Sequence, residues 1–328
     1  MVWLVSLVVI VLAGALFGVS GIVALQDLKT PDSCIGAAIV TEPDFPEIAP
    51  AASPIASPVT SPVAAGIVQS VEPVDGQISQ QLESLVRSLA ACKSAGDARG
   101  IATLTTADYR GVVYGGGVRL SQTDFLALME SAPITPVRVL AVSNGGFSGM
   151  RTVSADVGLV VGSQLLQERW TFVFRNADIP SDGTAIESAE QRSGFWLVHG
   201  VETMPVSVPA GSARIQVMLD EHTLDFAPTT MRGPDVTLVG RNIGNEPHEM
   251  LVIRLQPEAA SADLLLPAAD GFPPGIEIVG QATTLPGDQA ELVLIDLVSG
   301  TYTIVCLFPD SRGVPHLALG QEASFTVQ

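Results

Sequence analysis

The stretch Cys306-Leu-Phe-Pro-Asp-Ser-Arg-Gly-Val-Pro-His316-Leu-Ala-Leu-Gly-Gln321 is the most informative part of the C-terminal half of this chain. It follows the apolar run 302–306 and places a thiol, an imidazole and a side-chain amide on one short loop. A second imidazole, His248, stands far upstream, behind the turn-forming residues 242–247. Two strand ends from opposite parts of a β-sandwich would bring these side chains together, so we expect an all-β domain with a polar cluster at one end.

Residues 212–328 have hardly any helical periodicity and read as short strands separated by turns. Leu285-Pro-Gly-Asp288 and Val298-Ser-Gly300 are two of the turn signals, and this punctuation is typical of a β-sandwich. The expected strands are 215–219, 235–241, 249–255, 289–297, 301–307 and 323–327, with one helical turn around 261–265.

Four polar side chains of this domain make a candidate metal site. One thiolate, two imidazoles and a weak axial ligand are the ligands of a blue-copper centre. The thiolate would bond copper covalently, neutral imidazoles would complete a trigonal plane, and prolines in both ligand loops restrict the backbone. The sequence therefore predicts one type 1-like copper ion, held by His248, Cys306, His316 and Gln321.

The same domain resembles the cupredoxins. The resemblance rests on Asn242-x-Gly244-x-x-x-His248, on Leu285-Pro-Gly-Asp288 before a strand, and on Gly300-x-Tyr302 leading to Cys306. It implies a Greek-key sandwich in which the upstream His, the Cys and the downstream His bind copper trigonally, with an axial ligand further on. In this chain these positions are His248, Cys306, His316 and Gln321.

The chain departs from the common cupredoxin pattern at three points. Nine residues separate Cys306 from His316, a long loop of the kind found in the copper-nitrite-reductase branch. Gln321 stands where Met is usual, as in stellacyanin-like members, and its harder amide oxygen should favour Cu(II) and lower the reduction potential. Glu249 follows the first ligand histidine, where many members have Asn or Asp.

Residues 76–208 predict a separate α+β domain, with helices first and an antiparallel meander afterwards. The order of elements resembles the nuclear-transport-factor-2-like (SnoaL-like) superfamily, which has a cone-shaped α+β fold and includes both enzymes and inert assembly domains. The resemblance implies a homodimerisation module or a pocket, and carries over no catalytic residue. The expected helices are 77–94, 98–106 and 122–131, and the expected strands are 137–142, 151–161, 165–174 and 194–200. Candidate pocket residues are Asp108, Tyr109, Tyr114, Glu168 and His199.

The N-terminal part of the chain reads as a membrane anchor followed by a linker. Residues 1–25 carry no charge and are long enough to span a bilayer, whereas signal-peptide apolar regions have roughly 7–15 residues. We expect a transmembrane anchor or signal at 1–28 and a Pro/Ala/Ser-rich linker at 29–75. The folded parts are therefore expected on the extracytoplasmic face, or secreted if the segment is cleaved.

Charge and cysteine content exclude some classes of function. With 34 acidic and 16 basic residues the formal charge is −18, which argues against nucleic-acid binding. Three cysteines do not indicate a disulfide framework, and Cys92 is expected to be a buried apolar residue, although a bond to Cys34 is possible. His222 falls outside the ligand pattern and is expected at the surface.

Three functions remain open. The preferred one is a membrane-tethered copper protein that carries single electrons to an unknown redox partner or holds copper, with an electron carrier or binding protein favoured over an enzyme. The first alternative is a sandwich that has lost its metal and serves as an interaction module. The second is an enzyme or ligand-binding pocket in the cone-shaped domain.

Overall fold

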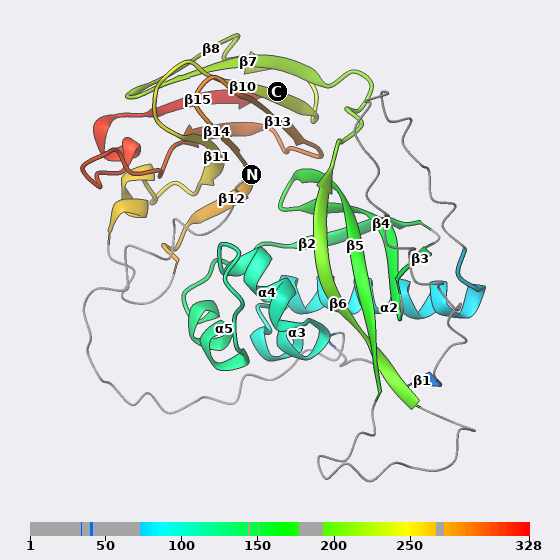
Figure 1. Cartoon of the computed structure of the whole chain (residues 1–328). Coiled ribbons are helices and arrows are strands. Elements are labelled where there is room, and N and C mark those ends of the chain that lie inside the picture. The colour runs from blue at the N-terminus through cyan, green and yellow to red at the C-terminus, as the bar shows by residue number, and fades with distance from the viewer. Residues whose placement is uncertain are drawn as a thin grey trace, which may run out of the picture.

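The computed structural model describes Cys34, Val40–Thr41 and residues 73–143, 145–149, 151–176, 193–266 and 272–328. Within these residues an α+β unit is followed by a β-sandwich (Figure 1). No helix in these ranges has the length and apolar character needed to cross a membrane. The predicted anchor at 1–28 lies outside the described residues, as does most of the linker at 29–75.

Helix α2, Gly76–Ala95, confirms the helix expected at 77–94. Asp75 caps its first turn, because its Oδ1 accepts the Ile78 N–H at 2.7 Å, and Gly96 ends it in the left-handed conformation. Its buried face contributes to the core of the α+β unit. The other helices of this unit are α3 (Ala98–Leu104), α4 (Ala107–Tyr114) and α5 (Gln122–Met129).

The expected single helix at 98–106 is wrong at its C-terminal end. Thr106 is the N-cap of α4, and its Oγ1 accepts the Tyr109 N–H at 3.3 Å. A threonine in this role starts a new helix, and α4 was not predicted. Figure 1 shows the helices packed on one side of the antiparallel sheet. Its strands are β2 (Val137–Val142), β3 (Gly146–Gly149), β4 (Thr152–Val161), β5 (Gln164–Asn176) and β6 (Ser193–Met204), and β1 (Val40–Thr41) pairs with β6.

The predicted β-sandwich is confirmed. Strands β10 and β13 lie side by side in one sheet, while the strands between them, β11 and β12, form a hairpin in the other, which is a Greek-key connection. The first sheet contains β7 (Ala213–Asp220), β8 (Thr223–Ala227), β10 (Val236–Asn242) and β13 (Gln289–Leu294). The second contains β9 (Thr230–Met231), β11 (His248–Leu255), β12 (Ile276–Thr284), β14 (Gly300–Val305) and β15 (Glu322–Val327).

The two units join at the β4–β5 hairpin. Gln164, at the start of β5, pairs with Leu294 at the end of β13. This pairing makes the first sheet of the sandwich continuous with the sheet of the α+β unit, ten strands in all among the described residues.

Cys34 and Cys92 form a disulfide, and this corrects the expectation of unpaired cysteines. Cys92 is buried as expected, but as one half of a cross-link between α2 and the segment before the α+β unit. The sequence did not reveal the pairing because 58 residues separate the two thiols. Residues within the expected linker at 29–75 are therefore tied to the α+β unit at Cys34 and through β1.

Candidate metal centre

Three strand and loop ends bring His248, Cys306 and His316 together. His248 is the first residue of β11, Cys306 directly follows β14, and His316 begins a short 3₁₀ helix, η2 (His316–Leu319). All three side chains are fully buried. β11 and β14 are neighbours, so the sheet itself places His248 beside Cys306.

The donor atoms fit a trigonal metal ion. Cys306 Sγ lies 3.9 Å from His248 Nδ1 and 3.4 Å from His316 Nδ1. Bonds of about 2.3 Å to sulfur and about 2.0 Å to nitrogen, 120° apart, would separate sulfur and nitrogen by about 3.7 Å. The three ligand atoms lie within 4.8 Å of one another, so one ion between them needs only small shifts.

Gln321, the residue directly before β15, lies beside this group. Its Nε2 donates to the backbone carbonyls of Asp220 and Thr223, the latter at 3.1 Å. Since a carbonyl only accepts, Nε2 is the donating atom of this amide, and both Nε2 and Oε1 lie 3.2 Å from His248 Nδ1. The amide of Gln321 therefore borders the His–Cys–His group, with its oxygen next to His248 Nδ1.

Cys306 is held as a protonated thiol in this setting. Burial raises the pKa of Cys306 to about 12, and the nearby Glu249 carboxyl adds to the effect. The Glu249 N–H donates to Sγ at 3.4 Å, which partly offsets the rise. A cation that binds thiolate strongly would therefore displace a proton on entering.

Glu249 also joins the two ligand strands. Its Oε1 accepts the Leu307 N–H at 2.8 Å. Glu249 follows His248 and Leu307 follows Cys306, so this bond connects the two backbone segments that carry His248 and Cys306. Burial raises the pKa of Glu249 to about 7, and the Leu307 N–H opposes the rise. Glutamate thus ties the loops together at the position where Asn or Asp was expected.

The two imidazoles have different surroundings. Burial lowers the pKa of His248, and the neighbouring His316 lowers it further, which favours the neutral ring that a metal needs. His248 Nε2 is buried and has no hydrogen-bond partner among the residues that the structure describes. His316 Nε2, in contrast, bonds Glu246 Oε2 at 2.9 Å.

The nine residues between Cys306 and His316 form a closed loop. Pro309 and Pro315 pair across its base. Inside it, Asp310 Oδ1 accepts the N–H groups of Arg312 at 2.8 Å and Val314 at 2.9 Å. These bonds explain how a long loop still holds Cys306 and His316 in place.

His222 is exposed, as expected, yet it lies over the site. Its ring packs edge-on against His316, with ring centres 6.3 Å apart. Glu246 was missed by sequence reasoning. An acidic residue two positions before a ligand histidine, in a Gly-Asn-Glu-Pro turn, was the available signal, but such residues are usually solvated.

The candidate pocket residues of the α+β unit do not form one cluster. Tyr109, Tyr114 and Glu168 gather round Lys93, whose Nζ lies 5.5 Å from the Tyr109 ring centre and 5.9 Å from that of Tyr114. Burial opposes the charged ammonium, but the two phenols and the Glu168 carboxyl raise the pKa of Lys93. The chain's own lysine thus occupies the space between these residues.

Asp108 and His199 lie apart from that group. They approach each other to 3.9 Å with side chains that are 46% and 38% exposed. His199 Nδ1 also meets Thr106 Oγ1 at 3.1 Å, on the same nitrogen that faces Asp108. A relay needs one partner on each ring nitrogen, so this pair is not arranged as a catalytic triad.

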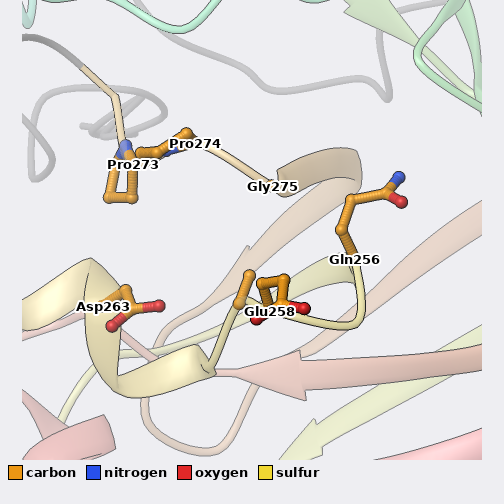
Figure 2. Close-up of a pocket in the computed structure, with 7 residues that line it drawn as sticks. Gln256, Glu258, Asp263, Pro273, Pro274 and Gly275 are labelled. Carbon is orange, nitrogen blue, oxygen red and sulfur yellow. The ribbon is translucent and has the colours of Figure 1, made fainter.

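A surface pocket of about 350 Å³ lies beside η1 (Ser261–Leu265) (Figure 2). Asp263 and Glu258 lie on one side of it and Pro273 and Pro274 on the other. One carboxylate oxygen of Asp263 is used by the Ala260 N–H at 2.8 Å. The residues that line this pocket include no histidine or cysteine, unlike the His–Cys–His group.

No protein-family model matches the chain, and no curated protein matches it. Solved structures do. Dithionite-reduced auracyanin from Roseiflexus castenholzii is 21% identical over 36% of this chain and 98% of its own, with a TM-score of 0.27. Auracyanin A, a "blue" copper protein from Chloroflexus aurantiacus, is 20% identical over 36% of this chain and 100% of its own, with a TM-score of 0.27. Oxidised plastocyanin from Dryopteris crassirhizoma is 20% identical over 35% of this chain and 100% of its own, with a TM-score of 0.21.

Proposed function

We propose that this chain is a copper protein that carries single electrons. The observation that carries the proposal is the buried His248–Cys306–His316 group, whose donor atoms lie within 4.8 Å of one another. Two imidazoles and one thiolate with a weak axial donor suit copper better than zinc, which prefers four strong ligands. Gln321 supplies the axial oxygen in this proposal. Auracyanin A, one of the solved structures similar to this chain, is described as a "blue" copper protein.

The protein contributes rigidity to this chemistry. Bound copper would supply a one-electron couple, and the ligands need to stay in place as its charge changes. Gln321 is held by two backbone carbonyls, and Glu249 joins the ligand strands. A donor set fixed in this way changes little on electron transfer, so the electron can move without large rearrangement.

We further propose that the protein is exported and tethered to a membrane by residues 1–28, with its folded units extracytoplasmic. The Cys34–Cys92 disulfide supports this placement, because disulfides persist in oxidising compartments. The redox partner and a homodimer through the α+β unit are part of the same proposal.

Titration of the purified, metal-free chain with Cu(II) tests the copper site. We expect an intense thiolate-to-copper charge-transfer band that saturates at one ion per chain and is absent in Cys306→Ser. His222→Ala serves as the matched control, because His222 is the other histidine near the site and its loss should leave the band in place. If the wild type gives no band and its Cys306 thiol still reacts with thiol reagents in the presence of copper, the metal-free interaction module is the better reading.

A further inference from the structure

Glu246 stands between the two ligand loops and contacts both. Its Oε2 bonds His316 Nε2 at 2.9 Å, and its Oε1 accepts the Ser311 N–H at 3.0 Å. Its backbone carbonyl accepts from Asn242 Nδ2 at 2.8 Å. Both oxygens of one carboxylate are thus engaged with the loop that carries Cys306 and His316, while its backbone belongs to the turn that carries His248.

The carboxylate determines which nitrogen of His316 can bind a metal. An ionised carboxylate only accepts hydrogen bonds, so the proton of a neutral His316 ring must sit on Nε2. The lone pair is then left on Nδ1, the atom that lies 3.4 Å from Cys306 Sγ. His316 is fully buried, so water does not compete for either nitrogen.

His248 lacks such a partner. Its Nε2 is buried and makes no hydrogen bond within the described part of the chain, although its Nδ1 faces the same cluster. The two imidazoles are therefore unequal donors. A carboxylate on the far nitrogen raises the basicity of a ligand histidine and fixes its ring, and it favours the more highly charged metal ion.

We propose that Glu246 is a positioning residue that orients His316 for copper and lowers the reduction potential of the site. This inference rests on the proposed copper function. It adds a charged residue that acts through His316 and lowers the reduction potential, as the oxygen donor of Gln321 is expected to do. The proposal concerns the hydrogen bond and the charge of Glu246, whereas a purely structural role would need only the bond to the Ser311 N–H.

Two substitutions separate these roles. Glu246→Gln keeps an oxygen that can accept from His316 but removes the charge, and Glu246→Ala removes both. Glu221→Gln is the matched control, because Glu221 accepts from Asn245 Nδ2 at 3.2 Å in the same turn and is not among the hydrogen-bond partners of His316. It makes the same change in charge without removing a hydrogen bond to His316, and its charge acts on His248 instead.

Two measurements test whether Glu246 orients His316 and lowers the reduction potential. In the metal-free chain, nitrogen NMR reports the His316 tautomer: we expect the Nε2-protonated form in the wild type and Glu221→Gln, and a mixture in Glu246→Ala. In the copper-loaded chain, Glu246→Gln should weaken Cu(II) binding by about 10-fold and Glu246→Ala by up to about 100-fold. With Cu(I) binding unchanged, a tenfold loss corresponds to a rise of about 59 mV in reduction potential.

Equal potentials in Glu246→Gln and Glu221→Gln, together with an unchanged tautomer in Glu246→Ala, would overturn the inference. The two proposals fail in different ways. A wild-type chain without the charge-transfer band removes the copper function and the effect on potential with it, while the tautomer in the metal-free chain still decides whether Glu246 orients His316. A normal band with unshifted variants removes only the role of Glu246.

Discussion

The side chain of Gln164, in the α+β unit, forms a pair of hydrogen bonds with the backbone of Gln281, in the sandwich. Its Nε2 donates to the Gln281 carbonyl at 3.0 Å, and its Oε1 accepts the Gln281 N–H at 3.0 Å. The side-chain amide thus makes the same pair of hydrogen bonds to Gln281 that the backbone of a neighbouring strand would make. Next to it, the Ser163 N–H donates to the Val279 carbonyl at 2.9 Å, and the Ser163 carbonyl accepts the Ile295 N–H at 2.8 Å. The turn before β5 therefore joins both sheets of the sandwich.

Gly162→Ala should separate the two units. Gly162 has φ +61°, and a Cβ there would lie 2.8 Å from the Ile278 carbonyl oxygen and 2.9 Å from that of Val279. Gly117→Ala is the matched control, because Gly117 has φ +91° and open space around its Cβ. The backbone strain should cost about 1–2 kcal/mol in both variants. The overlap should add about 1–3 kcal/mol in Gly162→Ala alone. Calorimetry should show a single unfolding transition in the wild type and in Gly117→Ala, and two separate transitions in Gly162→Ala. Equal destabilisation of both variants would contradict the conclusion that this turn couples the unfolding of the two units.

Gln321→Met should raise the reduction potential of the copper-loaded chain. A thioether is softer than an amide oxygen and favours Cu(I). The same change leaves the carbonyls of Asp220 and Thr223 without their donor, and it should cost about 1–3 kcal/mol in unfolding free energy. Redox titration and urea unfolding measure the two effects. A lower stability with an unchanged potential would show that Gln321 is a structural residue and not an axial ligand.

Asp310 should stabilise the ligand loop only above acid pH. The N–H of Val314, with help from Arg312, lowers the pKa of Asp310 to about 2. Because the folded-state pKa lies below the unfolded one, the stabilisation is present above the unfolded pKa of about 4 and disappears as pH falls through about 2. Asp310→Asn should therefore be less stable than the wild type at pH 6 and equal to it near pH 2.

Reaction of the buried Cys306 thiol with a pyridyl disulfide reagent reports opening of this loop. We expect faster labelling in Asp310→Asn at pH 6 than in the wild type, with the rates converging at low pH. Asp225→Asn removes an exposed carboxylate of β8 and should leave the rate unchanged. A pH-independent difference between Asp310→Asn and the wild type would show that charge is not the cause.

The Cys34–Cys92 disulfide should stabilise the α+β unit by about 4 kcal/mol, because it closes a loop of 58 residues. The double variant Cys34→Ser, Cys92→Ser removes it. Trp170 and Trp196 both belong to this unit, so their fluorescence follows its unfolding in urea. The double variant should unfold at lower urea than the wild type, and reduction should bring the wild type to the same midpoint. Reduction that leaves the wild-type midpoint in place would mean that the cross-link adds nothing.

Sequence patterns predicted those elements whose causes are local. The spacing of Ile78, Leu82, Leu85 and Leu89, with Gly96 after them, predicts α2 to within one residue at each end. The 3₁₀ turn at Ser261–Leu265 and the strand Val137–Val142 were likewise predicted at their observed bounds.

Strand β12 was missed, although it is nine residues long. Its burial does not alternate, and its pairing with β11 shifts register between Val252 and Ile253. A strand with an irregular pattern leaves no period of two in the sequence. Strands β1, β3, β8 and β9 were missed because they are short and depend on a partner strand for their existence.

The sequence alone determined the donor types of the candidate site and the sandwich that carries them. A thiol, imidazoles and an amide at strand ends can be recognised from residue identity, because the chemistry of metal binding depends on the donor atoms themselves. The folded structure was needed to show that Glu246 reaches His316 across 70 residues, that the Gln321 amide donates to the Thr223 carbonyl beside His248, and that Cys34 bonds Cys92. These contacts arise when loops far apart in the chain close on one another, and no local periodicity or capping preference encodes which side chains will then meet.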